Sequence, residues 1–173
     1  DNVTRRPALR QVVLWGAVLA LFGLTAVAMG TVVTESIGLA TAGLALVTSA
    51  LALGIVIPTF LWVDRLESEP ARVLWFAFLW GALVATFGAL ILNQLGFEVI
   101  DAVGGDPMVL APVVVAPVTE ELLKGLGVAV LFFRMRREFN GITDGIVYAG
   151  IIAAGFAFVE NILYLGRAYV EIG

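Results

Sequence analysis

Residues 113–133 read V-V-V-A-P-V-T-E-E-L-L-K-G-L-G-V-A-V-L-F-F, an apolar stretch with Glu120, Glu121 and Lys124 near its middle. The stretch has about the 20 residues that a membrane-spanning helix needs. An ionisable side chain near the centre of a bilayer costs about 2.5–3.5 kcal/mol on insertion scales. Such side chains face the interior of a helix bundle or a hydrated cavity, so the stretch predicts a functional site inside a membrane.

The composition of the whole chain is that of an integral membrane protein. Hydrophobic residues make up 61% of the 173 residues, and charged residues make up only 14%, far from the globular average. The chain contains no cysteine and no histidine, which excludes disulfides and thiolate metal sites within it. No basic face of the kind that binds nucleic acid is present, so nucleic acid is not an expected partner.

Five apolar stretches, each longer than about 20 residues, are separated by charged residues. Strands of a membrane barrel would alternate polar and apolar residues instead. The sequence therefore predicts an all-α, polytopic transmembrane helix bundle that forms a single domain over residues 1–173. The chain begins at Asp1 and stops soon after the last apolar stretch, so we expect a fragment of a longer protein with further helices beyond Gly173. The five spanning helices are predicted at residues 12–33, 37–63, 72–95, 108–133 and 145–166.

Basic residues predict how the bundle is oriented in the membrane. The positive-inside rule places the side that is richer in basic residues in the cytoplasm. We therefore expect a multi-pass protein of the cell membrane with its N-terminus in the cytoplasm. Arg167 falls on the opposite side, as does the acidic connection 96–107. The basic residues expected on the cytoplasmic side are Arg5, Arg6, Arg10, Arg65, Arg72, Arg134, Arg136 and Arg137.

The carboxylates of the last two predicted helices fall at the same depth. Glu120 lies 13 residues before Phe133 and Glu160 lies 15 residues after Gly145, which places both roughly 20 Å from the cytoplasmic boundary. Lys124 follows Glu120 by four residues and therefore lies beside it on the helix surface. A charged and a neutral carboxyl side by side suit general acid–base chemistry. The alternative is a Glu–Lys pair that only fixes helix packing, which leaves Glu160 without a role.

The last helix has a pattern of its own. Phe156, Glu160 and Tyr164 are spaced by four residues and share one helix face, whereas Asn161 is turned by about 100° from Glu160. Asn161 is predicted either to orient a substrate carbonyl or to make a hydrogen bond between helices.

Four further residues carry local predictions. Pro112 and Pro117 predict a kink, which either opens a water-filled pocket next to the glutamates or only bends the helix. Asp144 is predicted to cap the start of the last helix. Tyr148 is predicted to be an aromatic residue at the membrane interface.

The motifs E-E-L-L-K (120–124), D-G-I-V-Y-A-G (144–150) and G-F-A-F-V-E-N (155–161) together resemble the PrsW family of intramembrane proteases. That family is related to the CAAX prenyl endopeptidases and the bacteriocin-processing proteins. The segment D-R-L-E-S-E-P (64–70) also resembles a feature of the family. The resemblance covers about residues 64–165.

The resemblance implies an intramembrane endopeptidase that cuts a membrane-anchored protein within the lipid bilayer, such as an anti-sigma factor. The family pattern E-E-x-x-K corresponds to Glu120, Glu121 and Lys124, and F-x-x-x-E corresponds to Phe156 and Glu160. In this mapping Glu120 is the general base, and Glu121 and Lys124 set its protonation. Glu160 holds the water or the substrate backbone. The supporting residues are Phe156, Asn161 and Tyr164.

The resemblance leaves the cofactor open. The family is often called a metalloprotease family, but zinc prefers histidine or cysteine with at most one or two carboxylates. A divalent metal such as zinc is expected only if a histidine is supplied beyond Gly173, with Glu121 and Glu160 as further ligands. A metal-free mechanism that uses only the glutamates is the alternative.

Two other classes of function compete with the protease. One is a non-catalytic binding or immunity-type membrane protein on the same scaffold. The other is an ion- or proton-coupled transporter, because buried carboxylates also serve as proton relays. Transporters commonly contain paired repeats with broken helices, and the sequence shows no such internal symmetry.

Overall fold

The computed structural model describes residues 5–63, 65, 69–136, 139 and 141–172, with side chains from Gln11 onward. Every element in this part of the chain is a helix, which confirms the predicted all-α class. Of the residues singled out in the sequence, Asp64, residues 66–68 and Arg137 lie outside the described part, as do the side chains of Arg5, Arg6 and Arg10. The elements are α1 (Arg5–Ile37), α2 (Leu39–Val63), α3 (Ala71–Leu79), the π-helical turn η2 (Trp80–Ala85), α4 (Thr86–Ala102), α5 (Pro107–Leu110), the π-helical turn η3 (Ala111–Val115), α6 (Ala116–Arg134) and α7 (Ile142–Ile172).

Within the described residues, four helical stretches are long and apolar enough to cross a membrane, and the chain is a membrane protein. They are Gln11–Ile37, Leu39–Val63, Ala71–Ala102 and Ile142–Ile172. The fifth predicted span is also continuously helical, from α5 through η3 to α6. It differs in composition, because its three ionisable residues lie in the middle of the apolar run.

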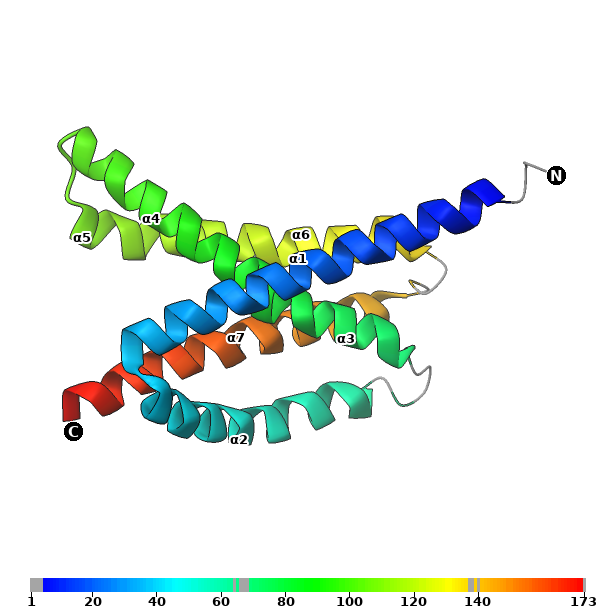
Figure 1. Cartoon of the computed structure of the whole chain (residues 1–173), viewed down its shortest axis with the longest axis horizontal. Coiled ribbons are helices and arrows are strands. Elements are labelled where there is room, and N and C mark those ends of the chain that lie inside the picture. Colours follow the sequence, from blue (N-terminus) through cyan, green and yellow to red (C-terminus); the bar gives the residue numbers. More distant parts are fainter. Residues whose placement is uncertain (1–4, 64, 66–68, 137–138, 140, 173) are drawn as a thin grey trace.

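The helical segments alternate in direction along the chain. Figure 1 shows the start of α1, the end of α2, the start of α3, the end of α6 and the start of α7 toward one end of the molecule. The connection from α1 to α2, the short α5 and the C-terminus lie toward the other end. Consecutive spans of a polytopic helix bundle have to alternate in this way.

Several helices run past their predicted limits. The helix predicted over 72–95 continues to Ala102, so the predicted connection 96–107 shrinks to residues 103–106. Similarly, α7 extends from Ile142 to Ile172 beyond the predicted 145–166. Hydropathy indicates only the part of a helix that lies inside the hydrocarbon core. The backbone hydrogen bonds of the helix continue beyond this part, up to a residue that ends the helix. Gly38, which follows α1, and Gly104, which follows α4, have φ of 76° and 78°, the left-handed conformation that ends helices.

The centre of the molecule is α7, which packs against α2, α3, η2 and α6. Its contact with the end of α3 and with η2 is backbone on backbone. A Cβ atom at Gly81 would lie 1.9 Å from the carbonyl oxygen of Ile152, and one at Gly155 would lie 2.2 Å from the carbonyl oxygen of Phe78. Close approach through small residues is how helices associate in lipid.

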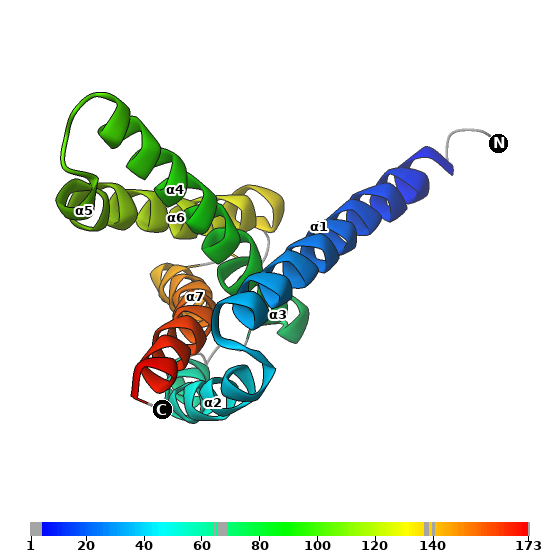
Figure 2. The same ribbon diagram turned by 60° about the vertical axis from the view of Figure 1, so that its left-hand side comes forward.

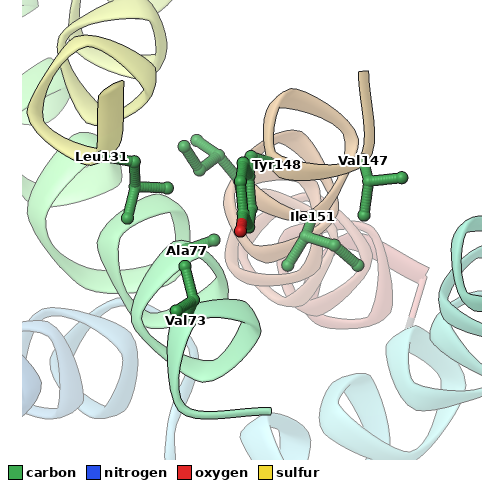
Figure 3. Packing of buried hydrophobic residues seen from close by; sticks show 7 residues of the cluster. Val73, Ala77, Leu131, Val147, Tyr148 and Ile151 are labelled. Carbon is green, nitrogen blue, oxygen red and sulfur yellow. The ribbon is translucent and has the colours of Figure 1, made fainter. Parts of the chain in front are cut away.

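Tyr148 of α7 is buried, in contrast to its predicted place at the membrane interface. Its exposed fraction is 0%, and Figure 3 shows it facing Leu131 of α6 and Val73 of α3. Its hydroxyl donates a hydrogen bond to Glu69. The prediction was wrong because position near a helix end does not say which face of the helix meets its neighbours.

Asp144 acts at the start of α7, as predicted. Its carboxylate accepts a hydrogen bond of 2.9 Å from the backbone N–H of Gly141, the residue before the helix. This is the reach-back contact of a capping box. Asp144 therefore supports the start of the helix from its third position, not from the N-cap position that the predicted start at residue 145 implies.

Candidate functional site

Glu120 of α6 and Glu160 of α7 line the same cavity, which has a volume of about 130 Å³. Both residues are half-buried. Since one water molecule takes about 30 Å³ in the liquid, the cavity has room for a few of them. The other lining residues are Thr86, Ala89, Leu90, Asn93, Ala116, Phe156, Leu163, Tyr164 and Arg167.

A polar contact between α4 and α6 fixes one wall of this cavity. The two helices run side by side in both views (Figures 1 and 2). Thr119, the residue before Glu120, donates its hydroxyl to Oδ1 of Asn93. Asn93 itself lines the cavity, so this bond sets the position of an amide group in the cavity wall.

A second contact ties α6 to the turn before α4. Nε1 of Trp80 in η2 donates to the carbonyl oxygen of Leu123 at 3.1 Å. Leu123 lies one turn after Glu120, so the bond holds the glutamate-bearing part of α6 against η2.

Two π-helical turns adjoin the cavity. At the end of η2, the hydroxyl of Thr86 donates to the carbonyl oxygen of Gly81 at 2.9 Å, five residues back. In the other turn, η3, Pro112 removes a backbone donor, and Pro117 removes another at the start of α6. At these two prolines the structure has a π-turn, and Ala116 directly after it lines the cavity. Such turns are frequent at functional sites.

The adjacent Glu121 points away from the cavity. Its side chain is 76% exposed, and Oε1 lies 2.6 Å from Nζ of Lys124. Lys124 is only 19% exposed, and its Nζ lies 4.8 Å from the ring centroid of Phe156. Lys124 thus contacts both the exposed Glu121 and Phe156, whose ring lines the cavity.

The structure brings together four of the residues selected from the sequence, namely Glu120, Phe156, Glu160 and Tyr164. Asn161 is placed elsewhere, in a hollow between α2 and α7.

Sequence reasoning missed Thr86, Asn93 and Thr119, and it used Arg167 only to predict orientation. The signal for Thr86 and Asn93 was a polar residue inside an otherwise apolar span.

The donor atoms of the cavity do not by themselves fit a zinc centre. Catalytic zinc takes three protein ligands, usually including histidine, whereas the sequence has no histidine or cysteine. Glu120 and Glu160 supply two carboxylates, and the described residues contain no group of three or more potential metal ligands.

Comparison with known proteins gives a consistent family match. The family model described as PrsW family intramembrane metalloprotease matches residues 69–173. Protease PrsW of Geobacillus kaustophilus is 32% identical over 127 residues, which cover 73% of this chain and 54% of that protein. Protease PrsW of Clostridioides difficile is 33% identical over 103 residues, which cover 59% of this chain and 42% of that protein. The chain spans about half the length of these curated relatives, and no solved structure gives a significant match.

Proposed function

The chain belongs to the PrsW family of intramembrane metalloproteases, and from this premise we propose that the Glu120–Glu160 cavity is part of the active site of an intramembrane endopeptidase. The observation that carries the proposal is that carboxylates from two separate helices line one small cavity. Because ionisable residues are costly at this depth, a structural role alone is a poor explanation for two of them facing one space.

Peptide hydrolysis adds water across the C–N bond and yields a carboxylic acid and an amine. Glu120 takes a proton from the water, and the resulting hydroxide adds to the carbonyl carbon. The proton then passes to the leaving nitrogen as the C–N bond breaks. Glu160 accepts a hydrogen bond from the same water and holds it in the cavity. The ion pair of Glu121 and Lys124 lies next to Glu120 in the sequence, and its charges set the protonation of the Glu120 carboxyl group.

Asn93 is suited to stabilise the oxyanion that forms at the substrate carbonyl. Asn93 lines the cavity, and in this proposal its Oδ1 accepts from Thr119 while its amide nitrogen donates to the oxyanion. A fixed donor aimed at developing negative charge is an effective form of catalytic stabilisation.

The proposed substrate is a membrane-anchored protein such as an anti-sigma factor, the class that the family resemblance implies. Glu120 lies 14 residues before Arg134 at the end of α6, which is roughly 21 Å along the helix. In a hydrocarbon core of about 30 Å, that depth is reached only by a substrate that enters the bilayer.

The start of α3 and the end of α6 lie toward one end of the molecule, and the C-terminal end of α7 lies toward the other (Figure 1). Arg72 and Arg134 belong to the first two of these helix ends, and Arg167 belongs to the last turns of α7. This distribution supports an N-terminus in the cytoplasm. The cavity then lies nearer the outer face, so the expected cut is on the extracytoplasmic side of the substrate.

Each cleavage of a peptide bond creates a new N-terminus, so the proposed activity is tested by comparing the protein N-termini of two membrane samples. This comparison covers all membrane-anchored proteins of a cell at once. Membranes from cells that make the full-length protein or its Glu160→Gln variant are labelled at free amines, and the labelled peptides are quantified by mass spectrometry. We expect new N-termini near or within membrane spans with the unchanged protein, and an at least ten-fold lower yield with the variant. Identical sets of N-termini in both membranes would rule out the endopeptidase.

A further inference from the structure

Arg167 of α7 belongs to the wall of the Glu120–Glu160 cavity, and the proposed chemistry does not use it. Glu160, Tyr164 and Arg167 are separated by four and then three residues, the spacing that keeps side chains on one face of a helix. All three line the cavity. The exposed Arg167 therefore extends the Glu160 face of α7 toward the C-terminal end of the helix.

The guanidinium group of Arg167 makes no ion pair or hydrogen bond within the described part of the chain. Glu171 lies four residues further along α7, a spacing at which opposite charges can pair on a helix surface, but the two side chains do not pair. Arginine carries five N–H donors in a planar fork that matches the two oxygens of a carboxylate. Arg167 thus retains its full capacity to bind a carboxylate.

The depth of Arg167 suits an acidic residue at the end of a transmembrane substrate segment. Arg167 lies seven residues after Glu160, which is about 10 Å further along α7. Since the sequence places Glu160 roughly 20 Å from the cytoplasmic boundary, Arg167 lies near the far boundary of a hydrocarbon core of about 30 Å. A carboxylate is costly in the middle of a span, whereas at this boundary it reaches the polar headgroup region.

The spacing between Glu160 and Arg167 also sets a distance along the substrate. An extended peptide rises by about 3.3 Å per residue, so 10 Å along α7 corresponds to about three substrate residues. The length of the arginine side chain widens this range to about two to four residues. A carboxylate bound by Arg167 therefore lies within a few residues of the bond that faces Glu160.

We propose that Arg167 binds the carboxylate of a substrate Asp or Glu about three residues from the scissile bond, on its extracytoplasmic side. Because Arg167 lines the same cavity as Glu120 and Glu160, an anion that binds it lies beside the reacting bond, which is the place of the substrate. The inference rests on the proposed protease function, and it names the class of substrate that this site takes.

Acidic residues surround Arg167 at this end of the protein. Asp101 belongs to the end of α4, Asp106 precedes α5, and Glu171 belongs to the last turn of α7. Figure 1 shows α5 and the C-terminus toward the same end of the molecule. Carboxylates at these positions repel an acidic substrate, so a preference for such a substrate has to come from Arg167.

The test follows the cleavage of peptides whose charge is changed at one position. The most abundant new N-terminus that the full-length protein generates in membranes defines a parent single-span peptide. Its versions carry Asp, Asn or Lys at the second, third or fourth residue from the cut, on the extracytoplasmic side, and initial rates are measured in phosphatidylcholine vesicles. At one or more of these positions, we expect the Asp peptide to be cleaved about three- to ten-fold faster than the Asn peptide, and the Lys peptide to be slowest.

Arg167→Glu should reverse this order and make the Lys peptide the fastest. Glu171→Gln is the matched control, because it also changes a charge on α7, but its side chain is exposed and does not line the cavity. The control should keep the order found with the unchanged protein. Thermal melting confirms that each variant is folded.

Equal rates for the Asp, Asn and Lys peptides with Arg167 intact would overturn the inference, and this comparison needs no variant of the protein. If Arg167→Glu slows all peptides by the same factor, the arginine binds a lipid phosphate or another part of the same protein, which also overturns it. Cleavage without a charge preference leaves the proposed activity standing and removes only the carboxylate site. If no new N-terminus is generated at all, the proposed activity itself fails, and the carboxylate site fails with it.

Discussion

Glu120→Gln is expected to lower the rate of substrate cleavage by about 10²- to 10⁴-fold, the range attributed to general acid–base catalysis. Glutamine has the shape of glutamate but takes no proton from water at neutral pH. Since Glu120 is half-buried at the wall of a small cavity, the substitution also removes a costly charge and should leave the protein folded. The measurement is the initial rate at which the new substrate N-terminus appears, with equal amounts of folded protein.

Glu121→Gln is the matched control, because it makes the same chemical change one residue further along α6. Its side chain is 76% exposed and pairs with Lys124, so it acts on the cavity only through that lysine. We expect a clearly smaller loss of rate than for Glu120→Gln. Full activity of Glu120→Gln together with an inactive Glu121→Gln would reverse the assignment of the general base.

The second large effect concerns stability, at Gly155, where α7 contacts the end of α3 and the start of η2. An added Cβ atom would lie 2.2 Å from the carbonyl oxygen of Phe78 and 3.0 Å from the backbone nitrogen of Ala82. Backbone atoms cannot turn aside as a flexible side chain does, so the two elements must separate. We expect Gly155→Ala to destabilise the protein by about 1–3 kcal/mol or more. Thermal melting in detergent measures the change.

Gly54→Ala provides the comparison for that experiment. Gly54 lies in α2, and an added Cβ atom there meets nothing within 4 Å. Because alanine favours helix more than glycine does, this variant should melt at or slightly above the temperature of the unchanged protein. If Gly155→Ala melts at that same temperature, the close packing of α7 on η2 is not present in the membrane protein.

The helical class and the shared depth of Glu120 and Glu160 follow from the sequence alone. Long apolar runs leave no alternative to helices in lipid, and counting residues from each end at a fixed rise per residue places side chains along a helix. The same reasoning put Phe156 and Tyr164 on the Glu160 face, and both line the cavity in the structure.

The sequence could not tell which helix covers each face. Glu121 and Asn161 each lie one residue from a cavity carboxylate, yet one is exposed and the other faces α2. Tyr148 was misplaced for the same reason, because its burial depends on α3 and α6. Asn93 was missed because its partner Thr119 comes from a different helix. Periodicity fixes directions within one helix and carries no information about its neighbours.

The central claim is that Glu120 and Glu160 act on the same water molecule. The most direct measurement compares the cleavage rates of Glu120→Gln, Glu160→Gln and the variant that carries both substitutions. Groups that act as a unit give strongly non-additive losses, so the double variant is predicted to be no slower than the slower single variant. A double variant whose loss equals the product of the two single losses would show that the two carboxylates act independently, and would contradict this account.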